Sequence, residues 1–234
     1  MAGYVRNPFT RTAFVVLTLI LLLLIPFLLF SLVGATFTKL GFSWREAIVI
    51  LALTLVGSFI NIPLKTVKNT EFRSEEIPVY PMYGRIYRII RGSPTTTIAV
   101  NVGGAVIPVA ISMYLLSKGL SASGGIFFAA FIFGISAVAL ITNMVAHPVP
   151  GLGIATPFFI PPLSALAAGL ILSIALGVNP SMIAYTSGTI GTLIGADILN
   201  LSRIGDLGAP VVSLGGAGTF DGIFLAGIIA AFLA

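Results

Sequence analysis

The chain has 234 residues, of which 57% are hydrophobic and only 8% are charged. Because a soluble domain is usually about 25% charged, this composition excludes an ordinary water-soluble globule and predicts a membrane protein. The sequence contains no cysteine and one histidine, which excludes disulfide scaffolds, thiol nucleophiles and a multi-histidine metal cage. We expect no metal and no cofactor. The net charge is +5, but the sequence shows no cluster of aromatic and basic residues of the kind that binds nucleic acid. We therefore expect contacts with membrane lipid and none with nucleic acid.

Seven apolar segments are predicted to cross the membrane as helices, since a span needs about 20 residues. They cover residues 13–35, 47–64, 97–117, 124–145, 160–177, 181–201 and 218–234. The first is expected to be a retained helix, because its apolar run is too long for a signal peptide. The predicted fold class is therefore all-α, a polytopic membrane protein of about seven helices with broken or re-entrant segments.

Charge divides the chain into three regions. Residues 1–64 hold two helices, residues 65–96 form a polar connector, and residues 97–234 form a five-helix membrane core. The connector carries six basic and three acidic residues. We interpret it as a solvated link anchored at the headgroups by tyrosine and arginine. Alternation in residues 85–90 suits a short strand or an interfacial helix, and the alternative interpretation is a strand or flap that pairs with an extended peptide.

The distribution of lysine and arginine predicts the topology. With seven spans, nine basic residues fall on the side of the N-terminus and the connector, and three fall on the other side, namely Lys39, Arg45 and Lys118. The positive-inside rule then predicts a multi-pass protein of the cell membrane whose N-terminus lies in the cytoplasm.

Two stretches of the core interrupt the apolar pattern. Asn101 stands just before a glycine pair, and Pro108 follows in the same predicted span. This pattern indicates either a kinked, closely packed helix or a broken helix that lines a polar cavity. Residues 143–162 contain five prolines around His147, which predicts a tight apolar loop or a re-entrant segment. His147 is either a structural residue at the membrane boundary or a proton carrier or ligand-binding group.

Two acids in the core are candidates for a site. Asp197 stands near the cytoplasmic end of the sixth predicted helix, after Gly188, Gly191 and Gly195, whose spacing predicts one smooth helix face. Asp221 stands in the first turn of the seventh helix. Since the two helices are expected to be antiparallel neighbours, their carboxylates should lie at similar depth. Intramembrane carboxylates are functional candidates, and two that share a site hold one proton, as aspartyl protease chemistry requires. The alternative is that Asp221 caps its helix and Asp197 faces headgroups.

Residues 218–224 (GTFDGIF) resemble the GxGD motif of presenilin and signal-peptide-peptidase-type intramembrane aspartyl proteases. Residues 196–199 (ADIL) resemble the YD-type aspartate on the preceding helix of that family. The resemblance implies that Asp197 and Asp221 are a catalytic pair. Phe220 and Ala196 differ from the motif residues, and the family's Pro-Ala-Leu element has no equivalent after Asp221.

The stretch from Asn101 onward also resembles an uncharacterised prokaryotic family of multi-span membrane proteins with a domain of unknown function. This second resemblance covers more of the chain and implies no activity.

Three functions fit these observations. The first is an intramembrane aspartyl protease that cleaves transmembrane helices or peptides. Its catalytic residues would be Asp197 and Asp221, and its substrate-binding residues would be Gly218, Thr219, Asn101 and His147. The second is a proton- or cation-coupled transporter that uses the same acids and the broken third span; it has no evident inverted repeat and would work as a homo-oligomer. The third is a structural or chaperone-like membrane protein whose acids cap helices.

Overall fold

The computed structural model describes residues 8–68, 75–79, 87–91, 95–149, 153–206, 209–216 and 222–234. These residues are mostly helical. The α-helices are α1 (Pro8–Lys39), α2 (Trp44–Gly57), α3 (Ile107–Ser123), α4 (Gly125–Val145), α5 (Ile160–Leu176), α6 (Pro180–Thr186) and α7 (Gly222–Leu233). The π-helical turns are η1 (Val102–Val106), η2 (Ser187–Gly191) and η3 (Leu193–Asp197), and η4 (Ile198–Asp206) is a 3-10 helix.

Four helical stretches in the described residues are long and apolar enough to cross a membrane. They are Thr12–Lys39, Val102–Ser123, Gly125–Val145 and Pro180–Arg203. The helices α4 and α5 end within one residue of their predicted limits. By contrast, α2 has 14 residues and α7 has 12, so at 1.5 Å per residue they reach about 21 and 18 Å, short of the roughly 30 Å hydrocarbon layer.

Seven strands also occur in the described residues, so the prediction of an all-α fold holds only as mostly helical. The strands are β1 (Asn61–Lys68), β2 (Glu75–Val79), β3 (Tyr87–Arg91), β4 (Thr95–Asn101), β5 (His147–Val149), β6 (Gly153–Ala155) and β7 (Val211–Leu214). They form a three-stranded sheet in the order β1-β4-β7 and two hairpins, β2-β3 and β5-β6. The strand alternative for residues 85–90 agrees with β3.

The sheet replaces parts of two predicted helices. The helix predicted over residues 47–64 ends at Gly57, and β1 follows from Asn61. Pro63 cannot continue a helix, and the pairing register of β1 and β4 shifts just after it. The helix predicted from residue 97 begins as β4 instead, because its run of threonine, isoleucine and valine favours a strand.

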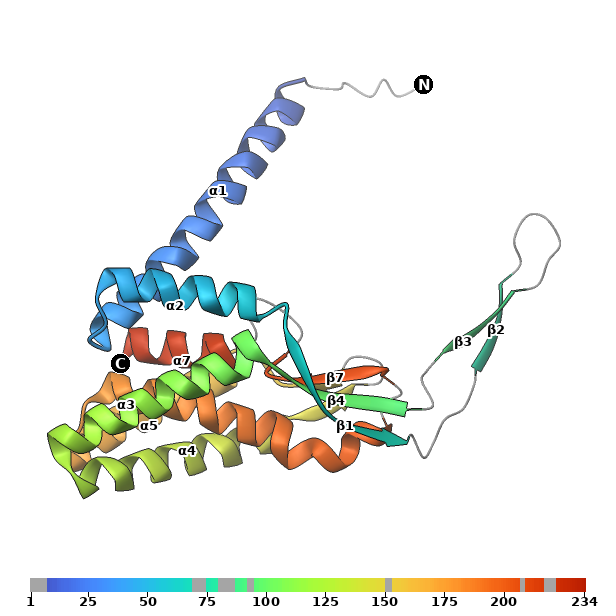
Figure 1. The fold of residues 1–234 in the computed structure, drawn as a ribbon. Helices are drawn as coiled ribbons and strands as arrows, with labels where there is room; N and C mark the ends of the chain where they lie inside the picture. The colour runs from blue at the N-terminus through green and yellow to red at the C-terminus, as the bar shows by residue number, and fades with distance from the viewer. Residues whose placement is uncertain are drawn as a thin grey trace.

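The strands β4 and β7 are parallel, and each leads into a helix. Strand β4 continues through η1 into α3, and β7 precedes α7 (Figure 1). All three strands of the sheet lie at one end of the helical body, which we call the sheet end (Figure 1). Two cations lie at the opposite end: Lys39 donates to the Phe232 carbonyl at 3.1 Å and Lys118 donates to the Leu40 carbonyl at 3.3 Å.

The segment from Pro180 to Asp197 is the central helix of the body, and 67% of its most apolar window is buried. Tyr185 is completely buried, and its ring lies 6.2 Å from that of Phe37 on α1. The predicted single glycine face is wrong in one respect. Gly188 packs on the backbone of α7, whereas Gly191 and Gly195 pack on α4, so the glycines admit two neighbours on two faces.

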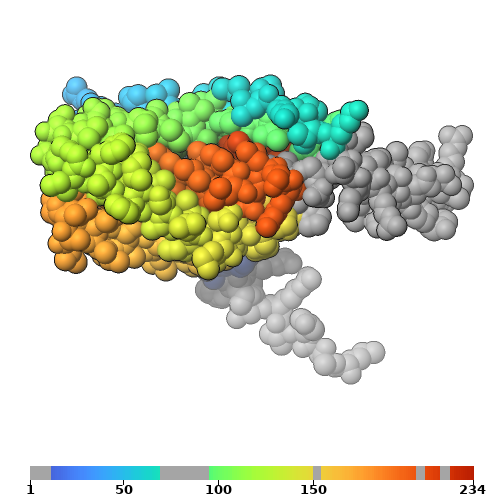
Figure 2. Space-filling view, turned by 90° about the horizontal axis from the view of Figure 1, so that it is seen from below, coloured from blue at the N-terminus to red at the C-terminus, as the bar shows by residue number. Residues whose placement is uncertain are grey.

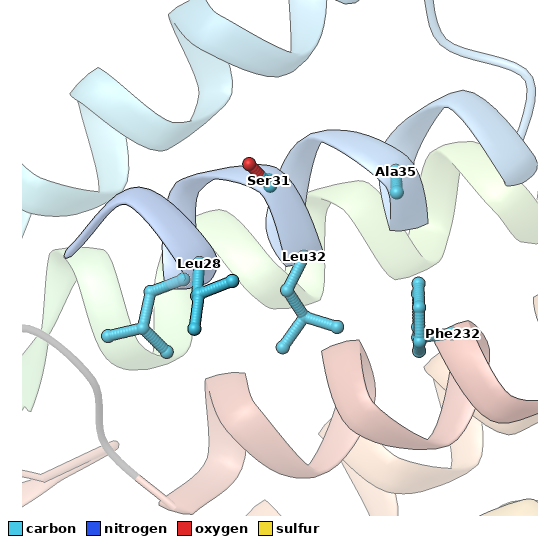
Figure 3. A pocket seen from close by; sticks show the side chains of 6 residues that line it. Leu28, Ser31, Leu32, Ala35 and Phe232 are labelled. Atoms are coloured by element: carbon cyan, nitrogen blue, oxygen red, sulfur yellow. The ribbon is translucent and has the colours of Figure 1, made fainter. Parts of the chain in front are cut away.

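The first half of α1 leans away from the body (Figure 1). Every side chain from residue 12 to residue 28 is exposed, although this stretch is strongly apolar, as expected of a helix that faces lipid. Where α1 meets α7 there is an apolar groove of about 480 Å³. Leu28, Leu32 and Ala35 of α1 face Phe232 of α7 across it (Figure 3), and Leu29 and Ser31 complete the lining.

We predict that Gly191→Ala destabilises the fold by about 1–3 kcal/mol, because the added methyl group would overpack the contact with Val138 and the Ile135 carbonyl. The matched control is Gly125→Ala in the first turn of α4, where an added methyl group meets nothing within 4 Å. Thermal unfolding in detergent micelles measures both variants. Equal unfolding temperatures for the two variants would show that the central helix is not tightly packed on α4.

Candidate functional site

The candidate site is built where β4 changes into a helix. Asn101 is completely buried and caps η1: its Oδ1 accepts a hydrogen bond from the Gly104 N–H at 2.7 Å. Its Nδ2 donates to the Ser58 carbonyl at 2.8 Å and to Asn61 Oδ1 at 3.1 Å. Because both N–H donors and the amide oxygen are engaged, this one side chain ties the end of α2, the start of β1 and the strand-to-helix change together.

Two glycines allow the backbone of η1 to approach its neighbours. A methyl group on Gly103 would collide with the Thr54 carbonyl of α2, and one on Gly104 would collide with the Gly215 carbonyl after β7. Pro108 is the second residue of α3 and follows η1 directly, so its missing N–H falls where the helix changes from π to α. The predicted interruption of the helix at Asn101 is therefore present, as a strand followed by a π-turn.

Asp197 contacts the turn after β7. Its Oδ2 accepts a hydrogen bond from the Gly215 N–H at 2.8 Å. Gly215 and Gly216 have φ angles of +87° and +80°, a left-handed conformation that favours glycine. Ser213 on β7 also donates to Asn61 Oδ1 at 2.6 Å. The carboxylate of Asp197 thus reaches a turn that hydrogen bonds also join to Asn61 and, through it, to Asn101.

Amide side chains hold the π-turn that ends at Asp197. Asn143 on α4 donates to the Gly195 carbonyl at 3.1 Å, and Asn200 donates to the carbonyls of Gly195 and Ala196 at 3.1 and 2.9 Å. A π-turn shifts backbone pairing away from the usual partner four residues back, so these amides occupy the carbonyls that the shift leaves available. The residues after Asp197 reach the surface at the sheet end (Figure 2), where Ile198 and Leu199 are exposed.

The packing of α7 places the start of that helix close to Asp197. Gly188 packs against the backbone of Ala226 and Gly227, and Ala184 joins Ala230 in one core cluster, so the central helix and α7 are antiparallel. Asp197 lies nine residues after Gly188, whereas α7 begins only four residues before Ala226. Asp197 therefore lies beyond the first residue of α7, on the side where its carboxylate bonds the Gly215 N–H.

The predicted site residues have different outcomes. Asp221, Gly218 and Thr219 lie outside the described residues. The structure brings Asp197 and Asn101 to one region through Gly215. The Gly215 N–H donates to Asp197, and the Gly215 carbonyl packs on Gly104. The Gly104 N–H in turn donates to Asn101.

His147 begins β5 after the end of α4, at the sheet end. It is exposed, and its Nδ1 lies 3.2 Å from the Val145 carbonyl. Within the described ranges, no group of three or more histidine, aspartate and glutamate side chains could hold a metal ion.

Sequence reasoning missed the polar partners of Asn101 and Asp197, which are Ser58, Asn61, Ser213, Asn143 and Asn200. One pattern could have indicated part of this set. Residues 101–105 (NVGGA) and 213–217 (SLGGA) share a polar residue, an aliphatic residue, two glycines and an alanine. In the structure both pentapeptides begin at or near the end of parallel strands, β4 and β7.

Comparison with known proteins identifies a family but no activity. The family described as Protein of unknown function (DUF1614) matches residues 55–233, and the chain belongs to it. The match includes every strand of the sheet, the central helix and α7. No curated protein and no solved structure is detectably similar to the chain, and nothing in these comparisons supports the resemblance to GxGD proteases.

We predict that Asn101→Ala lowers the free energy of unfolding by about 2–4 kcal/mol, because it removes a cap and leaves the buried Ser58 carbonyl without its donor. Asn179→Ala is the matched control: Asn179 is exposed and its side chain caps α6 through one hydrogen bond, to the Met182 N–H, so about 1 kcal/mol should be lost. Chemical unfolding in micelles measures both. A smaller loss at Asn101 than at Asn179 would contradict the role given to Asn101.

Proposed function

Taking the chain as a member of this family, we propose that it is an intramembrane aspartyl protease whose catalytic pair is Asp197 and Asp221. The observation that carries the proposal is the hydrogen bond from the Gly215 N–H to Asp197 Oδ2 at 2.8 Å. Gly215 begins the connection between β7 and α7, and Asp221 is the last residue of that connection in the sequence. A carboxylate held against one end of a seven-residue segment supports a pairing with a carboxylate at its other end.

The chemistry requires two carboxylates that share one proton. The ionised carboxylate takes a proton from water as the water attacks the peptide carbonyl, and the protonated one donates to the carbonyl oxygen. Gly218 and Thr219 are proposed to shape the backbone beside the pair. Asn101 acts in this account by holding η1 against Gly215, and His147 is proposed to contact the substrate at the sheet end.

The sheet suggests how a substrate would be presented. Strand β7 is an outer strand of the three-stranded sheet, and Val211 on it is exposed. An outer strand offers unpaired N–H and C=O groups to an extended peptide. We propose that a transmembrane segment unwinds near the sheet end and adds to β7, which brings a scissile peptide bond toward the turn at Gly215.

The proposed orientation has the N-terminus and the sheet end in the cytoplasm and the protein in the cell membrane. Two observations support it. Lys39 and Lys118, which the sequence assigns to the outer side, both lie at the end of the body opposite the sheet. The polar connector, which carries six basic residues in its sequence, begins and ends on the sheet, through β1 and β4.

A proton- or cation-coupled transporter is the second candidate. The observation that favours it is a set of five buried hydroxyl groups without a hydrogen-bond partner among the described residues, four of them on the central helix. Polar groups at such depth mark ion pathways in many membrane proteins. It would use the same two acids.

We predict that Asp197→Asn and Asp221→Asn each reduce cleavage by about 10²–10⁴-fold, because general acid–base catalysis contributes that much. The probe is a synthetic single-span peptide with a central glycine pair and a fluorophore–quencher couple, in liposomes with the purified chain. The matched control is Asp206→Asn, which changes the remaining acidic residue after residue 97 and should keep activity.

Cleavage of the peptide by both variants at the parent rate would contradict the protease. The same liposomes, loaded with a pH-sensitive dye, test the second candidate. Proton or cation uptake abolished by both variants, without cleavage by the parent chain, would favour the transporter.

A further inference from the structure

Five hydroxyl groups in the interior of the bundle have no hydrogen-bond partner among the described residues. They belong to Thr142 on α4 and to Tyr185, Ser187, Thr189 and Thr192 on the central helix. Each residue is at most 2% exposed. A buried hydroxyl without a partner is costly, and each case in a native protein calls for an explanation.

The backbone of the central helix explains why three of these groups, those of Ser187, Thr189 and Thr192, lack partners. Three hydroxyls in α-helical parts of this chain bond the carbonyl four residues back: Thr36 to Leu32 at 2.8 Å, Ser112 to Pro108 at 2.9 Å and Thr186 to Met182 at 2.9 Å. From Ser187 onward the helix is π-helical. Since π-turns move that carbonyl away from the side chain, the next hydroxyls lose the partner that Thr186 still has.

Three of the five hydroxyls lie on the face of the central helix that packs against α7. Thr189 and Tyr185 both contact Gly227 of α7, and the Tyr185 hydroxyl lies near the Thr189 side chain without the geometry of a hydrogen bond. Thr192 follows Gly188 by four residues, about one helical turn, and Gly188 packs on the backbone of α7. Asp197 comes five residues later, which is one π-turn. A line of oxygen atoms therefore leads from the centre of the bundle to the carboxylate.

We propose that Tyr185, Thr189 and Thr192 bind a file of water molecules that ends at Asp197 and supplies the water for hydrolysis. Each hydroxyl can donate and accept, which suits water, and buried water typically makes about three hydrogen bonds to such groups. Gly227 allows the Thr189 hydroxyl to pack directly against the backbone of α7. The supply of water to catalysis rests on the proposed protease function, whereas the binding of water does not.

The test replaces the hydroxyls with methyl groups of similar size in the double variant Thr189→Val and Thr192→Val. Amide hydrogen exchange of residues 185–197 is measured on the whole chain in lipid nanodiscs, together with cleavage of the fluorophore–quencher peptide. We expect exchange and cleavage to slow at least tenfold. Thr186→Val, which removes a hydroxyl already bonded to the Met182 carbonyl, should leave both rates unchanged. If the double variant fails to fold, Thr192→Val alone carries the test.

Each outcome decides a separate point. Unchanged exchange in the folded double variant would overturn the water file. A thermal stabilisation of the parent chain by Na⁺ or K⁺ that the double variant loses would also overturn it, because the hydroxyls would then bind a cation. Slower exchange in a chain that cleaves nothing would support the water file while contradicting the proposed protease.

Discussion

The fold depends on hydrogen bonds that satisfy the backbone N–H and C=O groups where helices are interrupted. Groups deep in lipid have no water to bond, so a break in a helix needs dedicated partners. At β4 the partner is Asn101, which caps η1 and bonds both Ser58 and Asn61. At the end of the central helix, the Asn143 side chain donates to the Gly195 carbonyl and the Asn200 side chain donates to the Ala196 carbonyl. Asp197 then bonds the Gly215 N–H, and this bond connects the two interruptions.

Much of the helical framework follows from the sequence, because α4 and α5 are uninterrupted apolar runs bounded by glycine or proline. The sheet could not be predicted in the same way. Strand β1 pairs with residues 27 to 40 positions later, and β4 pairs with β7 more than a hundred residues later. No local pattern shows which strands pair, although the threonine, isoleucine and valine of β4 favour a strand. Pro63 was the one local indication that the second helix ends early.

Only part of the candidate site was predictable from the sequence. Asp197 was prominent because charge is so rare after residue 97. Its partner Gly215 was not, because a backbone N–H has no sequence signature. The π-turns were also hidden, although they decide which hydroxyls lack partners. Small residues did indicate close packing, but not that Gly188 faces α7 while Gly191 faces α4.

The proposed protease requires that the carboxylates of Asp197 and Asp221 lie close together. The chain has no cysteine, so Asp197→Cys with Asp221→Cys gives a pair of thiols in an otherwise thiol-free protein. Oxidative crosslinking in membranes measures their separation, since a disulfide needs Cα atoms closer than about 7 Å. The account predicts rapid crosslinking of this pair and none for Asp197→Cys with Gly125→Cys at the other end of α4. No faster crosslinking than in that control would contradict it.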